Sequence, residues 1–137
     1  MKFRISASRF LDDERGAAMV EFALVATVIF FPLVFGFIEL GRQVFAKSTI
    51  TAAAREGVRF AIVRGADSPS PADSAAVANH VIGRTPLSPI IVLPTWEDPS
   101  KEYGTYAQVQ VRYNYVPLVR LLPSRTITST SRQVIVF

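Results

Sequence analysis

A single carboxylate, Glu21, lies at the start of the long apolar stretch of this sequence and is the residue there with the clearest chemical meaning. It is the fifth residue after Gly16, in the run Arg15-Gly16-Ala17-Ala18-Met19-Val20-Glu21-Phe22. An ionised carboxylate is costly in an apolar setting unless it pairs with a cation or reaches an interface. The spacing leaves two interpretations open: Glu21 is a boundary residue of a membrane helix, or it has a partner and a function.

The other residues that could do chemistry do not form a recognisable active site. His80 is the only histidine and the chain has no cysteine, so a usual zinc site and a thiol nucleophile are excluded. The sequence shows neither a nucleophile elbow nor a phosphate-binding glycine loop. We interpret His80 as a structural or surface residue and expect no enzymatic activity, no metal and no cofactor. Three further carboxylates are interpreted as solvated turn residues: Glu97, Asp98 and Glu102.

The positive charge does not indicate nucleic-acid binding. The net charge of +4 comes from arginines along the whole chain, without a basic run interleaved with aromatic residues. We interpret it as membrane flanks plus a solvated face. Glu39 is interpreted as a boundary residue beside Arg42 at the far end of the apolar stretch, and Trp96 and the tyrosines as sheet packing.

The apolar stretch is long enough to cross a membrane. From Phe22 to Ile38 no residue is charged, and with its flanks the segment reaches about 24 residues, against roughly 20 needed to cross the hydrocarbon core. Residues 17–40 are therefore predicted to form a transmembrane helix. Pro32 is expected to kink this helix, because it lacks a backbone donor.

Residues 1–16 form a short polar leader. An ordinary secretory signal has a shorter apolar core that is followed by an A-x-A-like cleavage site. Here the small-residue junction at Gly16 and Ala17 precedes the apolar segment, so processing there would keep the helix. Positive charge in the leader suggests a cytoplasmic N-terminus, although Arg42 and Lys47 on the other side weaken this argument.

Residues 41–64 are predicted to continue the helix, since no proline interrupts them. Gly57 is expected to weaken it, and Gly65 with the proline-rich segment after it should end it. A stripe at three-to-four spacing, apolar at its ends and small or polar in its middle, runs along this segment: Leu40, Val44, Ser48, Thr51, Ala54 or Arg55, Val58 and Ile62.

Residues 65–137 are predicted to form a small head with its own short helix and sheet. The helix is expected over Asp73–Ile82, with Asp73 as N-cap and Gly83 as its stop. Strands are expected at Ile90–Leu93, before a turn made by Pro94 with the Asp98-Pro99-Ser100 group, and at Tyr106–Tyr115 and Arg125–Phe137. Because this tail is small for an independent core, its sheet should pack on the helix extension. The fold class is α+β: a long N-terminal helix, a short helix and a small antiparallel sheet.

The N-terminal half resembles the TadE-like proteins of tight-adherence (Flp/Tad) pilus systems. The residues that carry the resemblance are Arg9–Gly16, Ala17–Leu24, Phe35–Arg42 and Ala53–Ala61. The tail after Gly65 is only generally similar and does not separate TadE from TadF- or TadG-like proteins. The short length of the chain favours the TadE type.

The resemblance implies a pseudopilin, a minor pilin-like subunit required to assemble the pilus. A prepilin peptidase would cleave after Gly16, and Glu21 with Phe22 would serve processing or assembly. Cleavage would free an α-amine at Ala17, one helical turn from Glu21, and a neighbouring subunit could pair with it.

The implied partners are the prepilin peptidase, other Tad pilins and pseudopilins, the inner-membrane assembly platform and membrane lipid, but no nucleic acid. The implied location is the bacterial inner membrane, with a single pass, a cytoplasmic N-terminus and a periplasmic head.

Two other functions fit parts of the pattern. A single-pass, membrane-anchored envelope binding or scaffold module would need no processing. An anchored hydrolase using His80 would lack its catalytic partners.

Overall fold

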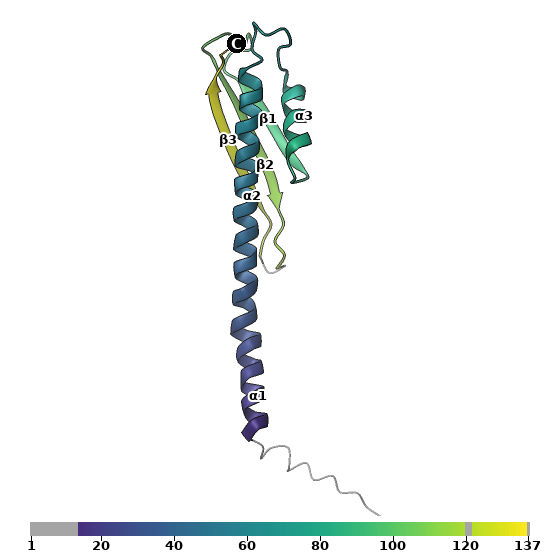
Figure 1. Ribbon diagram of the computed structural model, residues 1–137, viewed down its shortest axis with the longest axis vertical. Coiled ribbons are helices and arrows are strands. Elements are labelled where there is room, and N and C mark those ends of the chain that lie inside the picture. The colour runs from purple at the N-terminus through teal and green to yellow at the C-terminus, as the bar shows by residue number, and fades with distance from the viewer. Residues whose placement is uncertain (1–13, 120–121, 137) are drawn as a thin grey trace, which may run out of the picture. The chain divides into compact units, whose positions relative to one another are not determined.

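The computed structural model describes residues 14–119 and 122–136, so the leader expected over residues 1–16 falls largely outside the described residues. The described chain has a long helix, a short helix and a three-stranded sheet, in that order (Figure 1). The fold class is α+β, as predicted. The chain divides into two compact units at the Leu40–Gly41 boundary.

The long helix consists of three segments: α1 (Glu14–Val25), a π-helical turn η2 (Ala26–Phe30) and α2 (Phe31–Ile62). The π turn lies just before Pro32, which cannot donate a hydrogen bond to a carbonyl in the preceding turn. In the same region the Thr27 hydroxyl donates to the carbonyl of Ala23 at 2.7 Å. The irregularity expected at Pro32 thus takes the form of a π turn, one of the usual ways in which a helix accommodates such a break.

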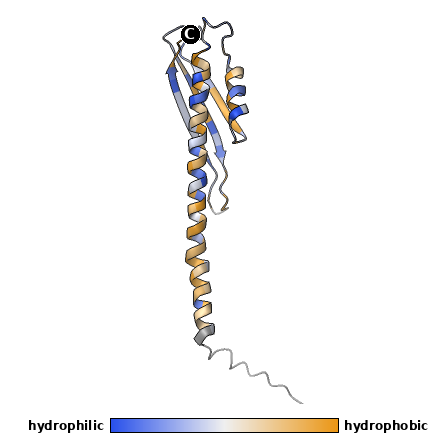
Figure 2. Ribbon diagram, viewed as in Figure 1, coloured by the Kyte–Doolittle hydropathy of each residue, from blue (hydrophilic) through white to orange (hydrophobic). Residues whose placement is uncertain are grey.

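The helix of the first unit consists mostly of hydrophobic residues (Figure 2), and many of its large apolar side chains are exposed. Met19, Phe22 and Phe37 are 74%, 75% and 67% exposed. The helix Gly16–Ile62 is long and apolar enough to cross a membrane, and none of its most apolar window is buried within the protein. Such a surface is typical of a segment whose solvent is lipid.

The short helix α3 (Ser74–Arg84) begins where the sequence predicts. The carboxylate of Asp73 accepts a hydrogen bond from the backbone N–H of Ala76 at 2.6 Å and caps the helix. The predicted stop at Gly83 is wrong, since α3 continues through it to Arg84. The hydroxyl of Thr85 donates to the carbonyl of Val81 at 2.7 Å and satisfies the helix end instead.

The sheet has the order β1-β2-β3, and both pairs of strands are antiparallel. Its strands are β1 (Ile90–Trp96), β2 (Tyr106–Tyr115) and β3 (Arg125–Val134). The prediction for β2 is confirmed at both ends. β3 ends at Val134 rather than at Phe137.

The turn predicted from Pro94 and the Asp98-Pro99-Ser100 group is confirmed at Asp98–Ser100 but wrong at Pro94. Pro94 lies inside β1, opposite Val109. β1 is an edge strand of the sheet, and only an edge strand readily accommodates a residue without a backbone donor.

The helix extension packs on the sheet, as predicted, and the core of the second unit lies between them. It is made by one face of α2, by α3 and by alternate residues of the strands. The buried members are Ile50, Ala53, Ala54, Val58, Ala61, Ala72, Val77, Val81, Ala107, Val109, Val111 and Ile135.

The face of α2 that packs agrees with the stripe only in its C-terminal part. Ala54 and Val58 are fully buried, whereas Val44 is 68% exposed and Ala46 and Ile50, outside the stripe, are buried. The buried face is rich in small residues because the neighbouring elements approach closely. A Cβ on Gly57 would lie 2.7 Å from Val81 Cγ2 and 3.0 Å from Val109 Cγ1. Gly57, expected only to weaken the helix, allows α3 and β2 to approach it.

Candidate functional site

The four residues singled out at the N-terminal junction lie on α1. Gly16 and Ala17 are in its first turns, and Glu21 and Phe22 are exposed in the middle of the segment. In an α-helix residues four apart lie on the same face. The Glu21 carboxylate is therefore one turn from the Ala17 backbone nitrogen, and negative charge near a helix N-terminus is favoured by the aligned peptide dipoles.

Glu39 is more buried than its interpretation as a boundary residue would require. A boundary carboxylate should reach solvent or headgroups, yet Glu39 is only 3% exposed. Burying a charge requires polar or charged surroundings, which the linear pattern does not reveal. Arg42 lies with its guanidinium 5.5 Å from the centre of the Tyr115 ring.

His80 is a structural residue that joins α3 to α2. Its Nε2 lies 3.2 Å from Glu56 Oε1, which also accepts a hydrogen bond from Arg84 at 3.1 Å. The imidazole stacks on the Phe60 ring with the ring centres 4.1 Å apart. The hydrogen bond from His80 holds the pKa of Glu56 below its usual value, and the positive charges of Arg84 and Arg59 act in the same direction.

Within residues 14–119 and 122–136 no group of three histidine, cysteine or carboxylate side chains could hold a metal ion. His80 and Glu56 are thus occupied in holding two helices together rather than in forming a ligand set.

The turn carboxylates organise the connection between β1 and β2. Asp98 accepts a hydrogen bond from the backbone N–H of Ser100 at 2.8 Å, which lowers the pKa of its carboxyl group. Glu97 accepts one from the backbone N–H of Tyr106 at 3.2 Å and lies 3.5 Å from Arg132. These contacts agree with the interpretation of both carboxylates as turn residues.

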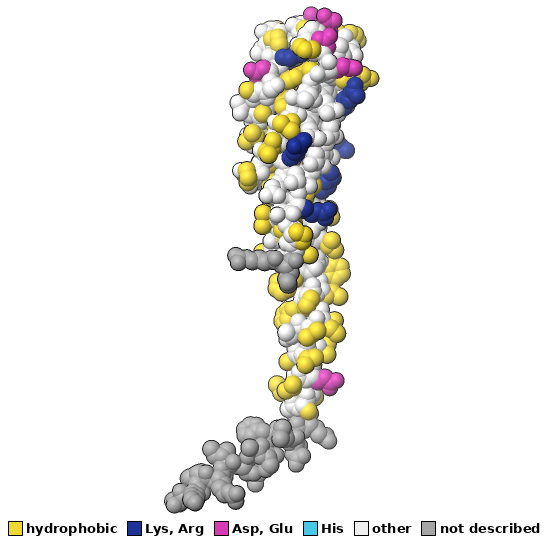
Figure 3. Space-filling view, turned by 180° about the vertical axis from the view of Figure 1, so that it is seen from behind, with side chains coloured by type: hydrophobic (Ala, Val, Ile, Leu, Met, Phe, Trp, Pro, Cys, Tyr) yellow, Lys and Arg dark blue, Asp and Glu magenta, His cyan; other side chains and the backbone are white. Residues whose placement is uncertain are grey.

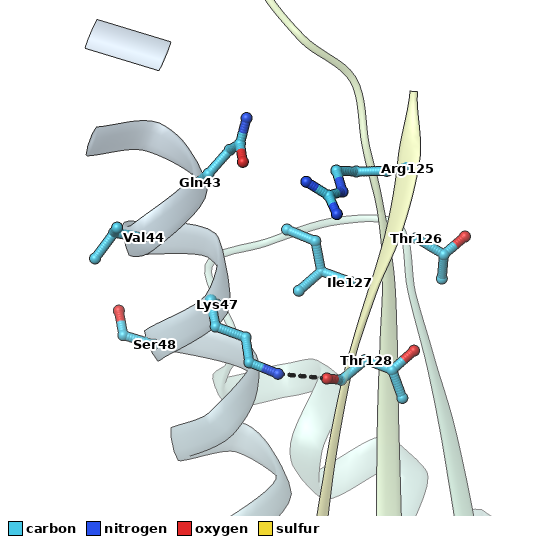
Figure 4. A pocket seen from close by; sticks show the side chains of 8 residues that line it. All are labelled: Gln43, Val44, Lys47, Ser48, Arg125, Thr126, Ile127 and Thr128. Carbon is cyan, nitrogen blue, oxygen red and sulfur yellow. Dashed lines mark hydrogen bonds between the residues drawn. The ribbon is translucent and has the colours of Figure 1, made fainter. Parts of the chain in front are cut away.

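A cleft between α2 and β3 is the feature that sequence reasoning missed (Figure 4). It has a volume of about 570 Å³ and two cationic lining residues, Lys47 and Arg125. Lys47 Nζ donates to the carbonyl of Thr128 at 2.6 Å, so the ammonium is held against the edge of β3. The two cations are far apart in the sequence, and only the pairing of β3 with β2 brings Arg125 to this side of α2.

Within the described residues the chain is α+β, with one apolar N-terminal helix that is long enough to cross a membrane and a second unit that contains the short helix and the sheet. Residues 16–59 match the family model described as TadE-like protein. This segment, about a third of the chain, is therefore similar to TadE-like proteins. The match ends within α2, before α3 and the sheet. No curated protein and no solved structure matches the chain.

Proposed function

We propose that this protein is a TadE-type, pilin-like minor subunit required for the biogenesis of tight-adherence (Flp/Tad) pili. It spans the bacterial inner membrane once through residues 17–40, with its N-terminus in the cytoplasm and its head in the periplasm. A prepilin peptidase cleaves it after Gly16. Its partners are that peptidase, other Tad pilins and pseudopilins, and the inner-membrane assembly platform, and it acts without a cofactor.

One observation carries this proposal: the TadE-like segment, residues 16–59, starts at the proposed cleavage site and coincides with the long apolar helix. The matched residues include Gly16, Glu21 and the part of α2 that forms one side of the head's core. The family's segment thus comprises both the anchor and the surface on which the head is built.

Cleavage after Gly16 requires a local change in the helix. α1 begins at Glu14, so the Gly16–Ala17 peptide bond lies in its first turn. The first N–H groups of a helix have no partner within the helix, which makes this turn the least costly one to unwind. We infer that the peptidase takes residues around Gly16 in an extended form while the rest of the helix stays folded.

Processing creates a positively charged partner for the Glu21 carboxylate. The new α-amine of Ala17 is cationic and lies one turn from the carboxylate. Between two subunits the same pair of groups would neutralise each other in the apolar interior of an assembly, where an unpaired carboxylate is costly. Glu21 therefore favours association of processed subunits over that of precursors.

The cleavage step is tested by the mature N-terminus. Intact mass and N-terminal sequencing of the protein from a strain with an active Tad system should show a chain that begins at Ala17. Gly16→Glu should abolish processing, whereas Gly16→Ala keeps a small residue and should be processed. A chain that retains Met1 in such a strain would refute the proposal.

The role of Glu21 is tested separately. Glu21→Gln removes the charge at nearly constant size, so cleavage and membrane insertion should persist while pili are lost. Glu102→Gln, a change at an exposed turn carboxylate of the head, is the matched control and should leave piliation unchanged. Normal piliation in the Glu21→Gln strain would disprove the assembly role.

The cleft between α2 and β3 favours a second candidate, an anchored envelope binding or scaffold module that needs no processing. A chain whose leader is replaced by an unrelated, uncleaved one distinguishes the two functions. Full activity of that chain would favour the binding module, and loss of piliation would favour the pilin-like subunit.

A further inference from the structure

We propose that the head makes a second contact with the membrane, in which the cleft between α2 and β3 binds the phosphate headgroup of an anionic lipid. Apolar side chains of the β2–β3 connection enter the adjoining bilayer surface. This inference rests on the membrane anchoring contained in the proposed function, but on neither cleavage nor pilus assembly.

The cleft has the donors that a phosphodiester requires. Lys47 uses one N–H on the Thr128 carbonyl and keeps two, since an ammonium has three. Arg125 contributes a planar guanidinium, whose donors match phosphate oxygens in pairs. It forms no ion pair with any other residue in the described ranges. The lining includes no carboxylate, so nothing in the cleft repels an anion.

The α2 residues that line the cleft follow closely on the end of the apolar stretch. Leu40 ends that stretch, and Gln43 and Lys47 come after it in the same helix. At the helical rise of 1.5 Å per residue these steps correspond to about 5 and 10 Å of helix, comparable with the roughly 5–8 Å depth of the headgroup region on each side of the hydrocarbon core.

The β2–β3 connection exposes apolar side chains at the same end of the head. Val116, Leu118 and Leu122 are 62%, 59% and 47% exposed. The connection leaves the sheet after Tyr115, whose ring lies 5.5 Å from the guanidinium of Arg42 near the start of the second unit. Exposed apolar residues combined with nearby cations are typical of surfaces that lie in a membrane interface.

The lipid site also explains why cations follow the proposed span, although their position opposes the proposed orientation. Cations that directly follow a span disfavour translocation of that side of the chain, so they require a local reason to be there. Figure 3 shows several Lys and Arg side chains on one face of the head. Cations at a membrane surface gain affinity for anionic lipid of about fivefold each, and Lys47 and Arg125 are placed to do so.

The headgroup site is tested with the full chain in zwitterionic detergent micelles. Dihexanoylphosphatidylglycerol is titrated, and amide NMR signals of Ser48 and Thr126 are followed. We expect saturable shifts with the anionic lipid and none with dihexanoylphosphatidylcholine. Lys47→Gln and Arg125→Gln should each weaken binding by about fivefold. Arg55→Gln, at an exposed cation farther along the same helix, should leave binding unchanged.

Three outcomes would overturn the site. They are equal binding of both lipids, an unchanged affinity in the Lys47→Gln and Arg125→Gln variants, and equally tight binding of inorganic phosphate, which would indicate a general anion site. A cleft that bound an acidic peptide more tightly than the lipid would be a protein-docking site instead. Incorporation of the same chain into nanodiscs tests anchoring independently.

The apolar contact is tested by fluorescence in nanodiscs that contain brominated lipid. Leu118→Trp should be quenched, whereas Ile91→Trp should not, although Leu118 and Ile91 are equally exposed at 59%. The wild type, with Trp96 alone, supplies the background. Equal quenching of the two variants would show that the β2–β3 connection does not enter the bilayer.

Discussion

The two halves of the long helix differ in the surfaces that they present. Before Leu40 the helix exposes large apolar side chains, with Phe22 75% and Phe37 67% exposed. After Gly41 its buried face consists of alanines together with Ile50 and Val58. The first half is uncharged from Phe22 to Ile38, whereas the second half has charged residues among its apolar ones.

The difference shows how side-chain size suits a surface to its surroundings. The large apolar side chains of the first half are exposed and fit against no other part of the described chain. Small ones let a sheet and a second helix approach closely, as Gly57 does for Val81 and Val109. Tight packing in the head then gains the dispersion contacts that a loosely fitted surface would lose.

The largest effect on the free energy of unfolding is expected from truncating Ile50, the largest residue of the buried face. Ile50→Ala should reduce the free energy of unfolding of the head by about 2–4 kcal/mol, since it leaves a cavity in a closed core. Unfolding of the full chain in detergent, followed by Trp96 fluorescence, measures this. Val44→Ala, on an exposed position of the same helix, should change it by less than about 0.5 kcal/mol. Equal losses in the two variants would contradict the assignment of faces.

A smaller effect on the free energy of unfolding is expected at Gly57, where α3 and β2 approach α2 closely. Gly57→Ala adds a methyl group that clashes with two stiff valine side chains, and overpacking of about 2 kcal/mol outweighs the gain in helix propensity of about 1 kcal/mol. Gly41→Ala, where no atom lies within 4 Å of the added Cβ, should gain that propensity without a clash. The same unfolding measurement should therefore give opposite signs, and stabilisation by both changes would show that α2 does not need Gly57.

The contact between α2 and α3 makes the stability of the head depend on pH. Because the pKa of Glu56 is lowered in the folded state, its stabilisation is present above the ordinary value of 4.5 and is lost as the pH falls through the folded value. Glu56 is half-exposed, so the contribution is below about 1 kcal/mol. Glu56→Gln should flatten the loss of thermal stability on acidification, and Glu102→Gln should not. An unchanged acid profile in Glu56→Gln would exclude this cause.

The smallest effect is expected in the half of the helix that exposes large apolar side chains. Phe22→Leu replaces one large exposed apolar residue with another, so membrane insertion and the unfolding of the head should stay within about 0.5 kcal/mol of the wild type. Flotation with liposomes and Trp96 fluorescence measure the two properties. A loss comparable to that of Ile50→Ala would show that Phe22 packs against protein.

The sequence was a good guide wherever a local pattern decides. The period-two alternation placed β2 correctly, and the Asp73 cap placed the start of α3. Local rules failed at Pro94 and Gly83, which the sheet edge and the Thr85 hydroxyl accommodate. The three-to-four stripe contained both Val44, which is exposed, and Val58, which is buried, because spacing reveals a period but not where along the helix a stripe packs.

Composition and spacing by themselves determined the apolar helix, the junction at Gly16 with Glu21 one turn beyond Ala17, and the α+β class, because chain length, periodicity and capping act over a few residues. Tertiary structure alone decided which face of α2 is buried, that Glu39 is withdrawn from solvent, and that Lys47 and Arg125 share a cleft. Those outcomes depend on contacts between residues far apart in the chain. The contacts form only when the strands pair and the sheet packs on α2, so no local sequence pattern predicts them.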